Sequence, residues 1–261
     1  MRALILAGGY GTRMQGILGD KPKALADIQG ETVIDRLLRV IQPQVSEISL
    51  ISNARYFSAF QDWQRLASIK VSLFQNESTH PGDRLGALGD LQRLLSLLGT
   101  DEPALVLASD TLLTGSLAGM FEQFGTSSAT QLAIRHNPDR QDQKRRGVVR
   151  LSKDNFVKEF VEKPVQPATD IAACPIYLMT AAALQGLSSY LLAGGARDAP
   201  GSYFSVLCQQ QPVQGWWVSN LLFDVGNPDS YQAAQAAAEV SSDRVADSPL
   251  AHRGPADEPS V

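Results

Sequence analysis

The sequence predicts an α/β fold, a Rossmann-like mixed sheet flanked by helices, because strand-like and helix-like segments alternate from Arg2 to Ala108. An alternation of this kind builds a parallel sheet with helices on its faces. After Thr130 the pattern changes and strand-like segments follow one another, which predicts a β-rich insertion beside the parallel part. The chain of 261 residues can hold one large domain of this kind or two small ones.

The elements of the first part follow from short apolar runs and from apolar residues at helical spacing. Strands are expected at residues 2–7, 47–52, 70–75 and 104–108, and helices at residues 32–41, 56–66 and 88–98. The last of these helices carries leucines at positions 88, 91, 94, 95 and 98, an amphipathic pattern that ends at Gly99. The first strand runs directly into glycines, and the last ends on Ser109 and Asp110.

The second part is expected to be rich in strands. They are placed at residues 131–135, 147–151, 157–161 and 172–178, with a polar link over residues 136–146. A helix at 180–192, a strand near 216–219 and a closing helix at 229–240 follow. From Ser241 onward the chain is mainly Ser, Asp, Pro and Ala, with little to bury. We therefore expect one domain over residues 1–240, with halves that meet between residues 129 and 130, and a disordered tail over 241–261.

Charge and cysteine content exclude several classes of partner. The formal charge of −4 provides no basic surface of the kind that binds nucleic acid or an anionic membrane, so neither is expected as a partner. Cys174 and Cys208 have the spacing of neither a disulfide framework nor a zinc site, and we expect free thiols. The apolar run from Met1 to Ala7 is too short for a signal or membrane-spanning helix. These features favour a cytoplasmic protein.

A glycine-rich segment after the first strand is the first candidate for a binding site. Residues 6–14 read Leu-Ala-Gly-Gly-Tyr-Gly-Thr-Arg-Met, and open α/β sheets bind ligands at this end of a strand. Glycines let backbone N–H groups approach phosphate oxygens, and Arg13 adds a fork-shaped cation. The segment is not a P-loop, because no Gly-Lys-Ser/Thr follows, and Met14 replaces the third glycine of a dinucleotide motif. Lys23, in the stiff sequence Lys21-Pro22-Lys23, supplies a second positive charge and completes a predicted phosphate site.

Three further motifs follow in order. They are Leu105 to Asp110, a buried strand that ends in an acid; Phe160-Val-Glu162-Lys163-Pro164, preceded by Gly147-Val148-Val149; and Phe223-Asp224-Val-Gly-Asn-Pro-Asp-Ser-Tyr231. Together with residues 6–25, these motifs resemble those of the sugar-1-phosphate nucleotidyltransferase family, which includes glucose-1-phosphate thymidylyl-, uridylyl- and cytidylyltransferases and mannose-1-phosphate guanylyltransferases. The resemblance extends over residues 1–237. It implies the nucleotide-diphospho-sugar transferase fold, with a nucleotide-binding half over 1–129 and a sugar-binding half over 130–240.

The resemblance implies that the chain condenses a nucleoside triphosphate with a sugar 1-phosphate. The products would be an NDP-sugar and pyrophosphate, in a Mg²⁺-dependent reaction of activated-sugar biosynthesis. Both reactants are polyanions, and two like unit charges about 4 Å apart repel by ~4 kcal/mol at an effective dielectric constant near 20. Cations are therefore the groups that the reaction needs first. Arg13 is expected on the triphosphate and Lys23 on the sugar phosphate, and Asp110 and Asp224 are expected as the Mg²⁺ ligands.

The remaining site residues are assigned to the two substrates by the same resemblance. The nucleotide is expected on Leu6, Ala7, Gly8, Gly9, Gly11, Thr12 and Arg13, and on the loop residues Asp83, Leu85 and Gly86. The sugar is expected on Gly147, Glu162, Lys163 and Tyr177.

Two positions depart from the family. The segment Cys174-Pro175-Ile176-Tyr177 has proline where many members have a glycine whose N–H faces the sugar, and proline has no N–H. Leu222 replaces a tryptophan two residues before the second metal ligand. The stretch 83–90 and the turn Asp198-Ala199-Pro200-Gly201 resemble a subgroup of thymidylyl- and uridylyltransferases, which favours dTTP or UTP as the nucleotide.

Two other functions remain open. One is nucleotidyl transfer to a cyclitol phosphate or another non-sugar phosphate acceptor, although such relatives generally lack the Glu-Lys-Pro and Asp-Val-Gly segments. The other is a catalytically inactive paralogue that senses nucleotide sugars, which the presence of all four expected catalytic and metal-binding side chains disfavours. The sequence leaves open the base, the acceptor and the oligomeric state, and a homo-oligomer is compatible with it.

Overall fold

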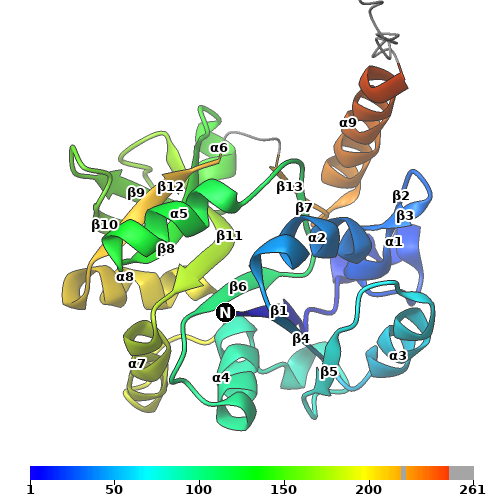
Figure 1. Cartoon of the computed structure of the whole chain (residues 1–261), viewed down its shortest axis with the longest axis horizontal. Helices are drawn as coiled ribbons and strands as arrows, with labels where there is room; N and C mark the ends of the chain where they lie inside the picture. The colour runs from blue at the N-terminus through cyan, green and yellow to red at the C-terminus, as the bar shows by residue number, and fades with distance from the viewer. Residues whose placement is uncertain (219–221, 247–261) are drawn as a thin grey trace, which may run out of the picture.

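The computed structural model describes residues 1–218 and 222–246 of the chain. Its main sheet has the strand order β10-β9-β11-β6-β1-β4-β5 (Figure 1). Strand β8 pairs with β11 on one side and with β12 on the other. Four neighbouring strands of this sheet run parallel to one another: β1 (Arg2–Ala7), β4 (Glu47–Ser52), β5 (Ser72–Gln75) and β6 (Ala104–Ala108). Because β11 (Ile171–Met179) runs antiparallel to β6, the sheet is mixed, and the predicted α/β fold is confirmed.

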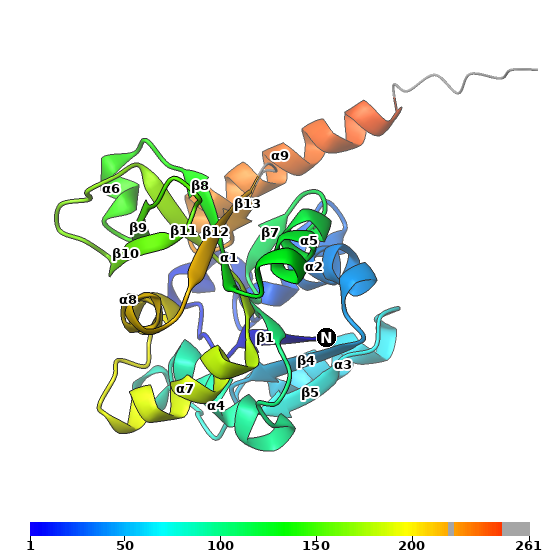
Figure 2. The ribbon, with the colours of Figure 1, turned by 60° about the vertical axis from the view of Figure 1, so that its left-hand side comes forward.

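Alternate residues of β1 enter two different cores, because successive side chains of a strand point to opposite faces. Ala3 and Ile5 pack with a first group of helices, whereas Leu4 and Leu6 pack with a second group. The first group is α2 (Val33–Ile41), α3 (Phe57–Leu66) and α5 (Ala118–Ser127), and the second is α4 (Ala87–Leu98), α7 (Ala181–Leu192) and α8 (Pro200–Gln210). The sheet therefore lies between two helical layers, and Figure 2 shows α4 and α7 together on one side, away from α2 and α5.

The two parts of the chain share one sheet through β11. This strand pairs with β6 and also with two strands of the β-rich part, β8 (Thr130–His136) and β9 (Gly147–Leu151). β10 (Val157–Glu162) pairs with β9, and β12 (Val213–Trp217) pairs with β8. The pairing of β11 with β8 changes register between Ala173 and Tyr177, the interval that contains Pro175, which has no N–H to donate to a neighbouring strand.

Some elements differ from those that the sequence predicts. Helices α5 and α8 were not expected, and the polar link 136–146 contains the short helix α6 (Arg140–Gln143). The strand expected near residues 216–219 begins earlier, at Val213, and Ser219 lies outside the described residues.

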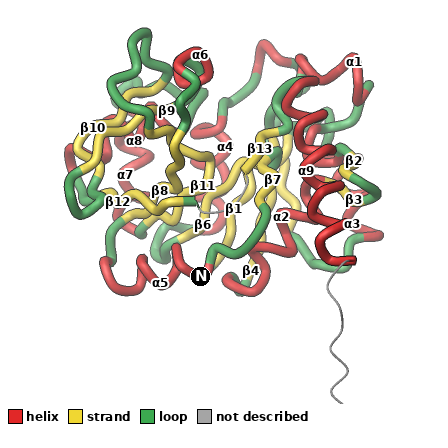
Figure 3. Tube along the Cα trace, turned by 90° about the horizontal axis from the view of Figure 1, so that it is seen from above, coloured by secondary structure: helices red, strands yellow, loops and turns green. Residues whose placement is uncertain are grey.

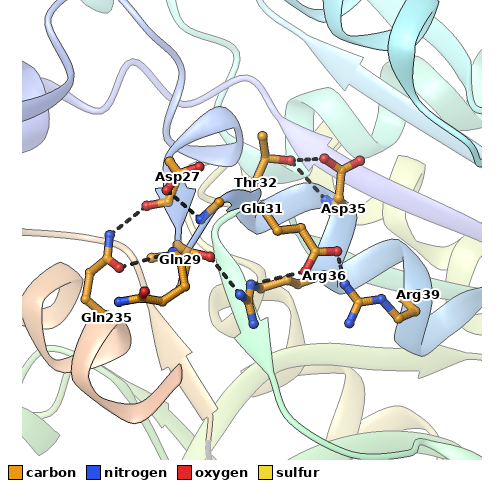
Figure 4. A network of polar contacts seen from close by, with 10 residues as sticks. Asp27, Gln29, Glu31, Thr32, Asp35, Arg36, Arg39 and Gln235 are labelled. Atoms are coloured by element: carbon orange, nitrogen blue, oxygen red, sulfur yellow. Dashed lines mark hydrogen bonds and ion pairs between the residues drawn. The ribbon is translucent and has the colours of Figure 1, made fainter. Parts of the chain in front are cut away.

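A small second sheet and the last helix complete the fold. β7 (Thr111–Leu113) pairs with β13 (Leu222–Asp224), and α9 (Pro228–Ala246) then projects from the body (Figure 1). Figure 3 shows α9 beside the hairpin of β2 (Asp27–Ile28) and β3 (Glu31–Thr32). In the polar network of Figure 4, the Asp27 carbonyl oxygen accepts a hydrogen bond of 2.8 Å from Nε2 of Gln235. The hairpin thus anchors α9, and with it the segment that follows Asp224.

The last helix continues beyond the domain end that the sequence predicts. Residues 241–246 belong to α9, and residues 247–261 lie outside the described part, so the predicted domain end and disordered tail stay predictions. The apolar contacts of Ala234 and Ala238 with the core below α9 support a helix in this place. Within the described residues, no helix combines the length and apolar composition needed to cross a membrane.

Candidate active site

A cavity of about 290 Å³ lies at the carboxyl ends of β1 and β6, the end at which open α/β sheets bind ligands. Of the residues assigned to the site from the sequence, those that line it are Leu6, Ala7, Gly8, Gly9, Lys23, Gly86, Asp110 and Tyr177. The cavity is also lined by Arg84, Asp90, Ser109, Pro175, Asp198 and Pro200. The fold therefore brings together the glycine-rich loop, the lysine and one acid predicted to act in the same place.

Lys23 and Asp110 form an ion pair at the centre of this lining. Nζ of Lys23 lies 3.0 Å from Oδ2 of Asp110, and both side chains are mostly buried. Lys23 begins a short 3₁₀ turn (Lys23–Leu25), and Asp110 follows β6. Gly11 has a positive φ of 60°, and a β-carbon there would lie 2.9 Å from Cγ of Lys23, so glycine makes room for the lysine stem beneath the loop.

The backbone of Asp224 lies beside that of Asp110. Asp224 pairs with Thr111 in the β7–β13 ladder, and the N–H of Val225 donates to the carbonyl oxygen of Asp110 over 3.0 Å. The side chain of Asp224 is not among the described parts of the structure. Within the described residues no cluster of three or more His, Cys, Asp or Glu could hold a metal by itself. Asp110 and Asp224 are thus neighbours along the backbone, and proteins commonly hold Mg²⁺ with one or two carboxylates together with substrate phosphates.

Asp90 is a cavity residue that the sequence analysis missed. It lies in the first turn of α4 with only 4% of its surface exposed, and its Oδ1 accepts a hydrogen bond of 2.5 Å from Nδ2 of Asn76. Burial raises the pKa of this carboxyl to about 6, partly opposed by the hydrogen bond from Asn76. The sequence does contain a sign of this residue: an acid stands one turn before Leu94, on the apolar face of a leucine-rich helix.

The Asp90 carboxylate fills the space next to Gly8. A β-carbon on Gly8 would overlap Oδ2 of Asp90, whereas a β-carbon on Gly9 would meet no atom within 4 Å. Neither glycine has a positive φ, so the two positions differ in free space and not in backbone conformation. The carbonyl oxygen of Gly8 also accepts a hydrogen bond of 3.1 Å from Nδ2 of Asn53, which holds the loop from below.

We expect Gly8→Ala to destabilise the protein much more than Gly9→Ala. Relieving the overlap with Asp90 must move the loop or the carboxylate, and overpacking of this kind costs about 1–3 kcal/mol in the free energy of unfolding. Gly9→Ala is the matched control, because a β-carbon there meets no atom of the protein within 4 Å. Equal melting temperatures for the two variants would contradict the crowding at Gly8.

One wall of the cavity is formed where the segment before α8 meets the start of α4. The N–H of Leu88 donates to the carbonyl oxygen of Arg197 over 2.9 Å, which satisfies a free donor of the α4 N-terminus. Gly86 has a positive φ of 77°, and a β-carbon there would lie 2.5 Å from the same oxygen. Across this contact Nε and Nη2 of Arg84 lie 3.2 and 3.3 Å from the two carboxylate oxygens of Asp198. Exposed pairs of this kind contribute only about 0–1 kcal/mol, so the backbone contacts hold the wall.

Asp83 and Leu85 do not line the cavity. The Asp83 carboxylate accepts hydrogen bonds from Oγ of Ser78 and from the N–H groups of Thr79 and His80. The hydrogen bond from Ser78 is the main cause that lowers its pKa to about 2. Asp83 therefore stabilises its own turn, and Gly86 is the one residue of the three assigned to this loop that reaches the cavity.

Arg13 and Thr12 are exposed on a 3₁₀ turn (Thr12–Met14) at the edge of the loop, outside the cavity lining. Met14, in the same turn, is buried and anchors it. Within the described residues the Arg13 guanidinium has no ion-pair or hydrogen-bond partner, so it is available to a ligand that extends beyond the cavity.

The residues assigned to the sugar divide into two sets. Tyr177 lines the cavity and stacks on Phe204 with ring centroids 4.8 Å apart, and burial raises the pKa of its phenol. Gly147, Glu162 and Lys163 lie outside the lining. A β-carbon on Gly147 would overlap the ring of Phe160, so packing alone explains the glycine.

Glu162 and Lys163 lie next to the first turn of α8. Oε2 of Glu162 occupies the space beside Gly201 in the first turn of α8, where the helix dipole favours an anion. Burial raises the pKa of Glu162, and the neighbouring Lys163 opposes that shift. Lys163 has a positive φ of 49°, a conformation uncommon for a residue with a side chain, and its Nζ lies 3.6 Å from Oε1 of Glu162.

Comparison with known proteins identifies the family. The chain is 24% identical over 260 residues to a mannose-1-phosphate guanylyltransferase catalytic subunit beta from Drosophila pseudoobscura pseudoobscura, covering 97% of this chain and 66% of the relative. It is 27% identical over 235 residues to mannose-1-phosphate guanylyltransferase 1 from Arabidopsis thaliana, covering 88% of this chain and 63% of the relative. The chain thus spans about two thirds or less of the length of these relatives.

Solved structures share the fold at low sequence identity. A UDP-glucose pyrophosphorylase complexed with UDP-glucose superimposes with a TM-score of 0.78 at 17% identity, over 92% of this chain and 98% of that structure. A UTP-bound UGPase from Acinetobacter baumannii superimposes with a TM-score of 0.73 at 17% identity, over 95% of this chain and 99% of that structure. The family model for nucleotidyl transferases matches residues 2–241, nearly all of the described fold, and this chain therefore belongs to the nucleotidyl transferase family.

Proposed function

We propose that this chain joins a nucleoside triphosphate to a sugar 1-phosphate, releasing pyrophosphate and forming an NDP-sugar for the biosynthesis of activated sugars in the cytoplasm. The observation that carries the proposal is the Lys23–Asp110 ion pair, which lies in one cavity with the glycine-rich loop. A cation and an acid beside a loop suited to phosphate are the groups that transfer between two polyanions requires. Within the described residues, Cys174 and Cys208 form no disulfide bond.

The reaction needs no covalent bond to the protein. An oxygen of the sugar phosphate attacks the α-phosphorus of the triphosphate, a new P–O bond forms, and the bond to pyrophosphate breaks. Lys23 neutralises the attacking phosphate and the charge that develops at the α-phosphorus. Arg13, exposed at the edge of the loop, binds the outer phosphates and the leaving pyrophosphate. The backbone of Leu6, Ala7, Gly8 and Gly9, together with Gly86, holds the nucleoside.

Asp110 and Asp224 are the side chains proposed to hold Mg²⁺. When bound, the ion would neutralise charge on the phosphate oxygens of both reactants. Lys23 keeps Asp110 in place by its ion pair and would release part of that contact to substrate phosphates.

The choice of base and acceptor is a finer proposal. Relatives described as mannose-1-phosphate guanylyltransferases suggest GTP with mannose 1-phosphate. Structures described as UDP-glucose pyrophosphorylases, and the subgroup features of the 83–90 stretch, suggest UTP or dTTP with glucose 1-phosphate. On the acceptor side, Pro175 lines the cavity without an N–H to offer, so the acceptor must be held by side chains and carbonyl oxygens at this point. Glu162, Lys163 and Tyr177 are the proposed sugar contacts, with Gly147 beside them.

The test is a pyrophosphate-release assay that crosses ATP, CTP, GTP, UTP and dTTP with sugar 1-phosphates and cyclitol phosphates in the presence of Mg²⁺. We expect turnover with at least one sugar 1-phosphate. Turnover with cyclitol phosphates alone would replace the sugar by a non-sugar acceptor. Folded protein that binds nucleotide sugars and turns over no pair would instead identify an inactive sensor and contradict the proposed function.

A further inference from the structure

Asp90 is an acid buried without a compensating cation. Only 4% of its surface is exposed, and within the described residues it has no ion-pair partner. Its pKa is raised by burial, and the hydrogen bond from Asn76 is the single opposing cause. Burying an unpaired carboxylate opposes folding, and acids kept in this state in a cleft are candidates for function.

One oxygen of Asp90 is free to meet a ligand. Oδ1 accepts the hydrogen bond from Asn76, while Oδ2 lies against Gly8, has no hydrogen-bond partner within the described residues, and belongs to a residue that lines the cavity. The carboxylate is thus fixed in orientation by one oxygen and presents the other as an acceptor.

The position of Asp90 along the sheet corresponds to the nucleoside end of the cavity. The strand order is β6-β1-β4-β5, and the Lys23–Asp110 pair lies at the end of β6. The Asp90 carboxylate lies between Gly8, at the end of β1, and Asn76, at the end of β5. If phosphates bind at the ion pair, a nucleoside that extends along the glycine-rich loop brings its base toward Asp90.

We propose that Asp90 selects the nucleobase by accepting a hydrogen bond from a ring N–H, so that the protein takes uracil, thymine or guanine nucleotides and rejects cytosine and adenine nucleotides. This inference rests on the proposed function of the same cavity. Uracil and thymine present N3–H, and guanine presents N1–H, to an ionised carboxylate, which can only accept. Cytosine N3 and adenine N1 carry lone pairs instead, and a lone pair facing a buried carboxylate is repelled. These two bases can donate to the carboxylate only from the exocyclic amino group beside that ring nitrogen, which requires a shifted position of the base.

A purely structural role for Asp90 predicts different behaviour from base selection. If the carboxylate only supports Gly8, its replacement should destabilise the protein and weaken all nucleotides alike. If it selects the base, Asp90→Asn removes a buried charge but keeps an oxygen for Asn76, so the protein should become more stable while it loses discrimination.

The experiment measures kcat/KM for UTP, dTTP, GTP, CTP and ATP, and for the N3-methyl analogue of UTP, in the wild type and in Asp90→Asn. Hydrogen bonds to charged groups contribute about 1.5–3 kcal/mol, so the preference for bases with a ring N–H should fall roughly 10- to 100-fold in the variant. The wild type should reject N3-methyl-UTP. In Asp90→Asn, the ratio of kcat/KM between UTP and N3-methyl-UTP should be smaller than in the wild type. The melting temperature of Asp90→Asn near neutral pH should exceed that of the wild type.

Two controls separate this inference from its alternatives. Glu77→Gln changes an exposed acid next to Asn76 that does not line the cavity, and it should leave the ratio between nucleotides unchanged. Asp90→Ala tests the same ratio in a second variant if Asp90→Asn does not fold. An equal loss for every nucleotide, or a lowered melting temperature with unchanged preference, would overturn the role in base selection.

Equilibrium binding of the nucleotides distinguishes failure of this inference from failure of the proposed function. A binding preference for ring N–H bases that depends on Asp90, in a protein without turnover, would retain base selection and reject the transferase. Turnover with a nucleotide preference that does not depend on Asp90 would retain the transferase and reject base selection by Asp90.

Discussion

Replacing Asp110 by asparagine is expected to reduce turnover by on the order of 100- to 1,000-fold, because the substitution keeps the shape of the side chain and removes its charge. Two consequences follow from the single lost charge. Lys23 loses the partner that holds its Nζ at 3.0 Å, and the cavity loses one of the two acids proposed to hold Mg²⁺. The effect should appear mainly in kcat, because the nucleoside contacts on the loop remain.

The measurement is pyrophosphate release at saturating nucleotide and acceptor over a series of Mg²⁺ concentrations. Asp101→Asn provides the control, because Asp101 is an exposed acid before the amino end of β6, the same strand that Asp110 follows. We expect wild-type behaviour from that variant. Substantial turnover by Asp110→Asn with an unchanged Mg²⁺ dependence would remove Asp110 from the proposed metal site.

The strands that the sequence predicts best are short runs of mostly buried residues. The runs at Arg2–Ala7, Glu47–Ser52, Ala104–Ala108 and Gly147–Leu151 are strands with the predicted bounds. Each is followed by Gly, Asn or Ser, residue types common in turns. In such segments local composition and tertiary burial require the same conformation, so the sequence pattern is sufficient.

Elements whose existence depends on distant partners were missed. β7 and β13 have three residues each and are paired with one another from positions more than a hundred residues apart. α8 begins with Pro200 and Gly201, a pair typical of a turn, and its inner face is formed by Tyr203, Phe204 and Leu207. Those aromatics are helical because β10 and α7 give them a surface to pack against, which no local pattern reveals.

The candidate site likewise contains residues that the sequence could place and contacts that it could not. Residues that directly follow buried strands, such as Gly8 and Asp110, could be placed at the carboxyl edge of the sheet from the sequence. The contact of Asp90 with Gly8, and the pairing of Arg84 with Asp198, depend on how α4 sits against the sheet and against the segment before α8. Within the stretch 83–90, the structure directs Asp83 to its own turn and Arg84 to Asp198.

Replacing Lys23 by alanine is expected to reduce kcat/KM for the acceptor by on the order of 100-fold or more, with a smaller change in the affinity for the triphosphate. The reason is the position of Nζ, which lies beside Asp110 in the cavity lining, whereas Arg13 is exposed at the edge of the loop and remains to bind the outer phosphates. Lys23→Met keeps the stem that packs against Gly11 and removes only the charge, so it separates packing from electrostatics. Lys21→Ala is the control, because it removes an exposed lysine two residues away.

The assay varies one substrate at a time and is accompanied by direct measurement of nucleotide binding. An equal loss for both substrates would show that Lys23 and Arg13 do not divide the phosphates as proposed. The double variant Lys23→Met with Asp110→Asn then tests whether the two side chains act as one unit. The effects of substituting two residues in direct contact generally do not add, so the double variant should be hardly slower than the slower of the two single variants. Losses that instead multiply would mean that the lysine and the acid contribute independently and that the ion pair of 3.0 Å does not couple them.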